Sequence, residues 1–211
     1  MGDEEEIRVT ARQLRALSHP LRTRMLGLLR SDGPATATTL AARLGESSGA
    51  TSYHLRQLAA YGFIERDTGR GVGRERWWRS AHARTVINSG DFMHDPDTRG
   101  ALDMFIHTVL DEHMQRIAAY VSEQGSWHKS WNDAADLSDA FVRLTPERSK
   151  QLVKEIHAVI DRYRDDASAE SEGAEQVIVG VQVFPRHARP GDPEPGAGPE
   201  AAGRRSGKAR S

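Results

Sequence analysis

The 211-residue chain contains no cysteine, which excludes disulfides, thiolate metal sites and cysteine nucleophiles. It also lacks any apolar run near the roughly 18 residues that a membrane-spanning helix needs. Its acidic beginning, residues 1–6, lacks the basic residues and the apolar stretch of a secretory signal. We therefore expect a cytoplasmic protein that does not contact membranes.

Lysine is missing from the first 90 residues, so the positive charge there comes from arginine alone. Residues 7–90 hold fourteen arginines and five acidic residues, a net charge of +9. Residues 91–175 hold nine basic and eighteen acidic residues, a net charge of −9. The net charge of −1 for the whole chain hides this division. This division of charge indicates that one half binds a polyanion and that the other half does not contact it. The alternative is that the charges cluster by chance.

The positive block has the pattern of four helices followed by a hairpin. Capping residues and apolar spacing predict helices that begin after Thr10, at Pro20, after Thr36 or Thr38, and after Ser47 or Ser48. Residues 63–67 and 75–80 predict two strands, joined by a turn that contains three glycines and several arginines. This order of elements is that of a winged helix-turn-helix, with the hairpin as the wing.

The fourth helix is the expected DNA reader. Its apolar spacing turns Thr51, Leu55 and Leu58 inward. The side chains on its other side are expected to contact DNA: Ser48, Ser52, Tyr53, Arg56 and Gln57. Arg56 suits guanine and Gln57 suits adenine in the major groove. In the hairpin turn, Arg70, Arg74 and Arg76 are expected to follow the backbone or an adjacent groove. The alternative is a solvated helix surface and an ordinary hairpin.

Two segments carry a resemblance to a known family. They are Leu17-Ser18-His19-Pro20-Leu21-Arg22-Thr23-Arg24-Met25-Leu26, and Thr51-Ser52-Tyr53-His54-Leu55-Arg56-Gln57-Leu58 with Tyr61-Gly62-Phe63-Ile64 after it. Residues 10–80 thereby resemble the ArsR-type winged helix-turn-helix repressors, over about a third of the chain. The resemblance implies a dimeric transcriptional regulator, usually a repressor, whose fourth helix reads the major groove. Carried over by position, it implies DNA contacts at Ser48, Ser52, Tyr53 and Arg56.

The metal chemistry of that family does not transfer, because its familiar site uses a Cys-x-Cys pair that this chain lacks. The remaining candidates are Asp103, His107 and Asp111, which follow one another at four-residue spacing on one side of a predicted helix. This spacing departs from the late-helix pattern of the family. Packed or interfacial side chains are the alternative, and we expect no cofactor.

The acidic block is expected to form a second domain after a linker at residues 88–97. Apolar spacing predicts a long helix over 98–123 with two apolar stripes, one for its own subunit and one for a second copy. Residues 140–144, 145–163 and 176–184 predict a strand, a helix and a strand, a small βαβ unit. Four aromatic residues line an effector pocket or fill the core: Tyr120, Trp127, Trp131 and Phe141.

These observations predict a mainly α protein with small β elements (α+β). The expected division is an acidic arm over 1–9, a winged helix-turn-helix domain over 10–88, a dimerisation or effector domain over 97–184, and a disordered tail over 185–211. No catalytic motif is present, so we expect a dimeric regulator that binds double-stranded DNA, most simply a repressor on an inverted repeat. A small-molecule effector is left open. The alternatives are a winged-helix protein-interaction module and a metal-sensing repressor that works without cysteine.

Overall fold

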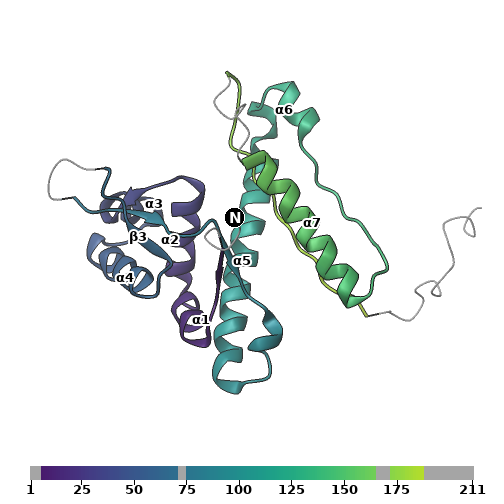
Figure 1. Cartoon of the computed structure of the whole chain (residues 1–211). Helices are drawn as coiled ribbons and strands as arrows, with labels where there is room; N and C mark the ends of the chain where they lie inside the picture. The colour runs from purple at the N-terminus through teal and green to yellow at the C-terminus, as the bar shows by residue number, and fades with distance from the viewer. Residues whose placement is uncertain (1–5, 71–74, 165–171, 188–211) are drawn as a thin grey trace, which may run out of the picture. The chain divides into compact units, whose positions relative to one another are not determined.

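The computed structural model describes residues 6–70, 75–164 and 172–187, and the chain divides into two compact units, residues 1–136 and 137–211. Each unit is described by itself. The protein is mainly helical with a small sheet, as the sequence predicts (Figure 1). None of the described helices is long and apolar enough to cross a membrane.

The first four helices begin where capping residues lie. Helix α1, Ala11–Leu17, starts with a capping box in which Thr10 and Gln13 bond to each other's backbone. Helix α2, Pro20–Ser31, has proline in its first turn. Of the paired candidates, Thr36 caps helix α3, Ala37–Leu44, and Ser47 caps helix α4, Ser48–Ala60, each by accepting a backbone N–H bond.

The wing forms as expected and gains a strand that we did not expect. Strands β3, Ile64–Arg66, and β4, Trp77–Ser80, are the two predicted strands. The added strand β2, Ala35–Thr36, pairs antiparallel with β4 and places Ala35 opposite Trp78, so the sheet order is β2-β4-β3. Because β2 leads directly into α3, this pairing fixes the start of α3 beside the wing.

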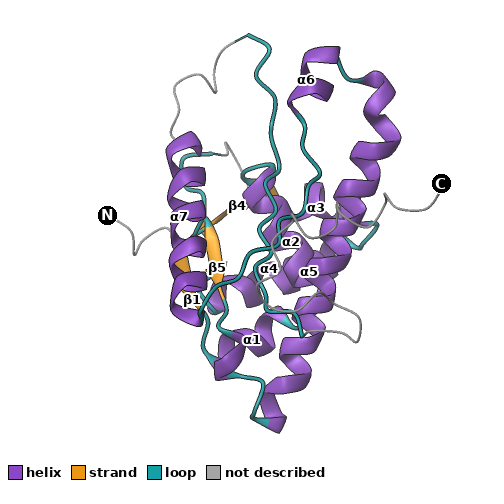
Figure 2. Ribbon diagram, turned by 90° about the vertical axis from the view of Figure 1, so that its right-hand side faces the viewer, coloured by secondary structure: helices purple, strands orange, loops and turns teal. Residues whose placement is uncertain are grey.

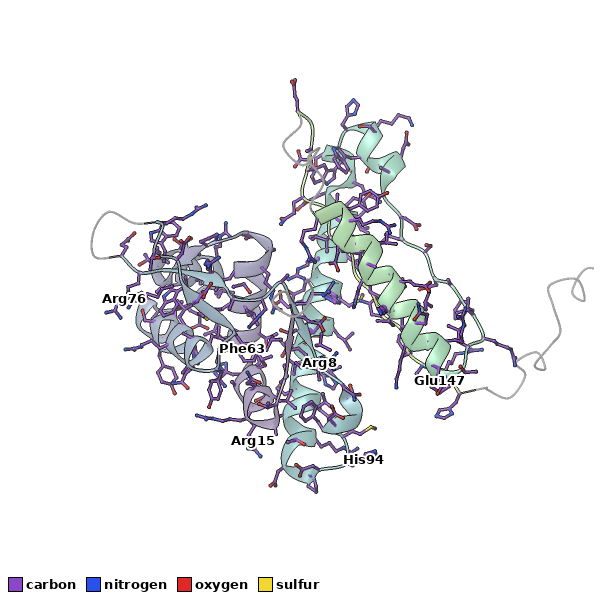
Figure 3. All side chains as sticks on the ribbon, in the orientation of Figure 1. Arg8, Arg15, Phe63, Arg76, His94 and Glu147 are labelled. Carbon is purple, nitrogen blue, oxygen red and sulfur yellow. The ribbon has the colours of Figure 1, made fainter. Side chains whose placement is uncertain are left out.

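The core of the first unit lies between α1, α2, α4 and the wing. Its fully buried side chains include Leu14, Met25, Leu55 and Phe63, and Figure 3 shows Phe63 in the interior of this unit. Deletion of a large side chain from such a core costs about 2–5 kcal/mol.

The long helix α5, Pro96–Glu123, belongs to this first unit rather than to a second domain. It packs against α1 and α2, with Leu102 buried and with Arg24 of α2 bonded to Glu112 at 2.8 Å. We expected the second domain to begin near residue 97. The structure places the division at residue 137 instead, because one side of α5 packs on α1 and α2.

The expected arm at residues 1–9 is part of the fold where it is described. Strand β1, Glu6–Arg8, pairs parallel with strand β5, Arg84–Val86, and the next residue, Val9, is buried. Beside β5, the half-buried Arg30 of α2 donates hydrogen bonds to Ser80 Oγ, His82 O and Thr85 Oγ1. Burial lowers the pKa of Arg30 to about 10.

Short helical turns connect the longer elements. The 3₁₀ turn η1, Ser89–Asp91, lies in the expected linker. The 3₁₀ turn η2, Gln124–Ser126, follows α5 directly, and helix α6, Lys129–Ala134, comes next (Figure 2). His128 explains the start of α6, because its ring accepts a hydrogen bond from the Ser130 N–H.

The second unit contains the predicted helix but not the predicted strands. Helix α7, Pro146–Arg164, matches the expected span. Residues 140–144 and 176–184 have no regular secondary structure, so the expected βαβ unit is not formed in the described part of the unit. Of the expected tail at 185–211, only residues 185–187 lie within the described residues.

Candidate nucleic-acid interface

Helix α4 has one buried side and one open side, as its sequence predicts. Thr51, Leu55 and Leu58 are fully buried. The side chains expected to face DNA are all at least partly exposed: Ser48, Ser52, Tyr53, Arg56 and Gln57. Tyr53 is 52% exposed, which is unusual for an aromatic side chain that only supports a core. The exposed side of α4 is therefore available to a ligand.

Arg56 is the most prominent donor on this side. Its Nε donates to the backbone oxygen of Ser52 at 3.2 Å, one turn earlier in α4. This bond holds the side chain along the helix surface and leaves its two terminal nitrogens to donate outward. A planar pair of N–H donors is what recognises the O6 and N7 atoms of guanine, or a phosphate.

A pocket of about 390 Å³ joins α4 to the wing and to the start of α3. Its lining residues are Thr36, Ala37, Thr38, Ser52, Arg56, Glu75, Arg76 and Trp78. Arginine from two elements and the amino end of α3 face this space, and both attract negative charge. The carboxylate of Glu75 also lines the pocket and weakens this attraction. The pocket therefore suits a phosphate of an extended polyanion more than it suits an apolar ligand.

Two of the three arginines predicted to contact DNA from the wing lie within the described residues. Arg70 is exposed and pairs with Asp67 at 3.5 Å, where the Asp67 carboxylate also accepts from the Gly69 N–H. Arg76 is exposed at the outer side of the unit (Figure 3). The third predicted wing arginine, Arg74, lies outside the described residues. Two exposed arginines, Arg70 and Arg76, are thus described in this part of the chain.

The two adjacent tryptophans of β4 are structural, and Arg66 adds a cation above one of them. Trp78 is 7% exposed and Trp77 is half-buried, which agrees with packing rather than base stacking. The Arg66 guanidinium lies 5.6 Å from the centre of the Trp78 ring, a cation–π distance.

A histidine pair lies where α2 meets α4. The rings of His19 and His54 have centroids 4.3 Å apart, and Tyr53 meets His54 edge-on at 5.2 Å. Burial lowers the pKa of His54, and the nearby charges of His19 and Arg22 lower it further, while Glu46 opposes them. Burial also lowers the pKa of His19, with Arg22 adding to it. The two rings thus form a contact between the start of α2 and the middle of α4.

The metal candidates on α5 do not form a metal centre. Asp103, His107 and Asp111 are all exposed, and His107 Nδ1 donates to the backbone oxygen of Asp103 at 2.7 Å. Within residues 6–70, 75–164 and 172–187, no group of three or more metal-binding side chains is placed to hold an ion.

The four aromatic residues proposed for an effector pocket divide between the two units. Tyr120, Trp127 and Trp131 are half-buried near the end of α5 and in α6. Tyr120 donates to Asn132 at 3.4 Å, and the Trp127 Nε1 atom is buried without a hydrogen-bond partner. Phe141 belongs to the second unit and is 84% exposed.

Sequence reasoning missed part of the pocket beside α4. Thr38, Glu75 and Trp78 line it, although none was expected to face DNA. They meet there because β2 pairs with β4, and a two-residue strand leaves no readable pattern. The only sequence signal that drew attention to Thr38 was its place near the predicted start of a helix.

A family model agrees with this geometry. Residues 17–67 match a family model described as a helix-turn-helix domain, a range that runs from the end of α1 through β3. A comparison with curated proteins gave no match. Among solved structures, the crystal structure of RV1404 from Mycobacterium tuberculosis is 19% identical, covering 71% of this chain and 84% of that chain, with a TM-score of 0.27. The arrangement of α3, α4 and the wing is thus a helix-turn-helix domain, a module that binds DNA.

Proposed function

We propose that the protein is a dimeric regulator of transcription that binds an inverted-repeat operator through α4 and the wing, and that it represses. The observation that carries this proposal is the pocket shared by α4, the wing and the start of α3, into which Arg56 and Arg76 bring positive charge. The +9 charge of residues 7–90 supports it, because a cationic surface gains affinity for DNA by releasing counterions. The resemblance of residues 10–80 to ArsR-type repressors supports the repressor role.

The exposed side of α4 distinguishes DNA from a protein partner. A winged helix that docks on a protein presents an apolar surface, which would exclude water from the interface. Here the exposed side carries serines, an arginine and a glutamine, and Tyr53 is its one large aromatic side chain. Polar donors on a helix that follows a turn are the means of reading base edges.

The proposed dimer forms through α5, whose second apolar stripe is exposed. Leu110, Met114, Ile117 and Val121 follow one another at alternating spacings of four, three and four residues, and are 47%, 62%, 41% and 51% exposed. This spacing is that of a coiled-coil seam. A second copy that covers the stripe would place two α4 helices on half-sites about one helical turn of DNA apart.

A salt titration tests the proposed function. Genomic fragments retained at moderate salt are sequenced, and the full-length protein is then titrated against the enriched site and against random duplex over a range of salt concentrations. We expect a steep loss of affinity for both duplexes as salt rises, with a tighter site that reads as an inverted repeat. The absence of binding to either duplex at low salt would reject the proposal.

A further inference from the structure

The arginines of the first unit divide into those that pair with a carboxylate and those that do not. Within residues 6–70 and 75–90, an acidic partner is present for Arg8, Arg24, Arg43, Arg70, Arg79 and Arg84. Two of the arginines without one, Arg56 and Arg76, line the pocket beside α4. Three more belong to α1 and α2, and these α1–α2 arginines are Arg12, Arg15 and Arg22.

Arg22 is the member of this group whose donors the fold satisfies least. It is half-buried, its Nη2 donates to the backbone oxygen of Arg15 at 3.3 Å, and its Nε is buried without a hydrogen-bond partner among the described residues. Arg30, which is also half-buried in α2, donates three hydrogen bonds to the protein. A partly desolvated cation with so few acceptors is costly for a fold. An anion beside the Arg22 guanidinium would offset that cost.

Two tyrosines place the α1–α2 arginines beside α4. Burial lowers the pKa of Arg22, while Tyr53 and Tyr61 raise it, so both phenols lie near its guanidinium. The Arg12 guanidinium lies 5.3 Å from the centre of the Tyr61 ring. Arg15 is exposed and follows Arg12 by three residues, on the same face of α1. The three arginines therefore lie where α1 and α2 meet α4.

This cationic group and the pocket lie on opposite sides of α4. Ser52 lines the pocket, whereas His54 contacts His19 at the start of α2. These two residues of α4 point about 160° apart, because successive residues of a helix turn by about 100°. Figure 3 shows Arg15 and Arg76 at separate ends of the first unit. The exposed side of α4 therefore has arginines along both of its edges.

The dimensions of DNA match this arrangement. A helix about 10–12 Å in diameter fills a major groove about 12 Å wide, so a phosphate backbone lies along each edge of the helix. We propose that Arg22, with Arg12 and Arg15 beside it, binds a phosphate of the DNA backbone that lies across the major groove from the pocket. This inference rests on the proposed function, which supplies DNA as the ligand. Contacts to both backbones fix the position of α4 between them.

One acidic side chain lies near this edge of α4. Glu46, exposed in the turn before the helix, raises the pKa of both His19 and His54. Its single negative charge leaves the three arginines in excess, so the edge stays cationic.

Uncharged DNA linkages test which phosphate Arg22 binds. In the operator selected from genomic fragments, each phosphate of a half-site is replaced in turn by a methylphosphonate, and the affinity of the full-length chain is measured by fluorescence anisotropy. We expect replacement of the contacted phosphate to weaken binding by roughly tenfold, because a charged hydrogen bond is lost. Arg22→Gln should weaken binding to the unmodified operator by a similar factor and become insensitive to that one replacement. Its sensitivity at the opposite backbone should remain.

Salt dependence gives a second measure of the same contact. On operator and random duplex alike, Arg22→Gln should reduce the slope of log affinity against log salt by about 0.9, the value for one phosphate. Arg24→Gln is the matched control, because it removes the same charge from the same helix. Arg24 pairs with Glu112 at 2.8 Å and points about 160° away from Arg22. The control should keep the parent pattern of methylphosphonate sensitivity.

Arg15→Gln keeps the test decisive if the half-buried Arg22 cannot be replaced without unfolding, which urea unfolding detects. Arg15 is exposed, and its backbone oxygen still accepts the bond from Arg22. We expect a several-fold loss of affinity on both duplexes and reduced sensitivity at the same or the adjacent phosphate.

Either of two results would overturn the inference. One is that the folded variants bind with the affinity and salt slope of the parent chain. The other is that they bind more weakly but keep its full pattern of methylphosphonate sensitivity, which would make the α1–α2 arginines structural. In both cases the parent chain still binds the operator, so the proposed function stands. A parent chain that binds no duplex at low salt removes both.

Discussion

Arg56 is the residue on which sequence discrimination depends in the proposed interface. Its Nε is held by the Ser52 carbonyl at 3.2 Å, so its terminal nitrogens are already oriented for a base or a phosphate. We expect Arg56→Ala to weaken binding to the selected operator by roughly 1–3 kcal/mol and to relax preference at one base pair. Fluorescence anisotropy against the operator and its single-base variants measures both effects.

Arg99→Ala is the matched control for that substitution. It removes the same exposed side chain and the same charge from α5, so operator affinity should change little at moderate salt. If the two variants bind the operator equally well, Arg56 contributes only general positive charge and does not read a base.

The histidine pair at the contact of α2 and α4 makes stability depend on pH. Burial and Arg22 lower the pKa of both His19 and His54, so the folded state binds fewer protons than the unfolded chain. The stabilisation is therefore present above the ordinary histidine pKa of about 6.5 and is lost as pH falls through that value toward the lowered ones. We expect the urea midpoint to fall between pH 7.5 and pH 5.5.

Replacing both histidines measures how much of the pH dependence of stability comes from the pair. His19→Gln/His54→Gln should flatten the pH profile of the unfolding free energy, because the two titrating groups are gone. Some slope should remain from His113, whose pKa burial also lowers, with Arg116 adding to it. A double variant with the same profile as the parent protein would show that the pair does not titrate on unfolding.

At the scale of elements, two adjacent serines at the start of α4 have separable tasks. Ser47 accepts a hydrogen bond from the Ala50 N–H at 3.2 Å and caps the helix, whereas Ser48 is exposed in the first turn. We expect Ser47→Ala to lower the free energy of unfolding by about 1 kcal/mol. Ser48→Ala should leave stability nearly unchanged and weaken DNA binding, which urea unfolding and anisotropy test separately. Equal stability losses would contradict this assignment.

The helices were predictable from sequence because their ends carry local chemistry. Thr10 marks a start through its capping hydrogen bond, Pro20 through its fixed φ, and Gly62 marks a stop through its positive φ. The apolar spacing of α4 likewise sorted its buried residues from its exposed ones. Where two caps were possible, as at Ser47 and Ser48, the sequence alone did not decide, since either hydroxyl can reach a free N–H.

Strands β1, β2 and β5 were not predictable, because their signal is not local. β1 pairs with β5 some 78 residues away, with Glu6 opposite Arg84, and three residues show no usable alternation. β2 has only two residues, yet it brings Thr38 and Trp78 to the pocket beside α4. The part of the pocket that α3 forms therefore depends on the pairing of β2 with β4, which exists only in the folded chain.

At the scale of the whole molecule, the charge division and the structural division fall at different places. The net charge changes sign near residue 90, whereas the first compact unit extends to residue 136 and includes α5. The composition identifies the cationic residues, but packing determines which elements share a compact unit with them. Leu102 of α5 is buried in the core of the first unit, and this burial joins the acidic helix to the cationic residues 7–90.

In the proposed function, the exposed apolar stripe of α5 determines whether the protein is a dimer. We expect Leu110→Lys/Ile117→Lys to raise the dimer dissociation constant by at least about tenfold in sedimentation equilibrium, because two charges would enter each side of the seam. Met104→Lys is the matched control: Met104 is 50% exposed on the same helix but lies about 100° round it from the stripe. A dimer that tolerates the double change yet is lost in the control would place the interface on the other side of α5.

The double variant should also bind a single half-site with unchanged salt dependence and lose its preference for the inverted repeat, because each α4 would then read DNA alone.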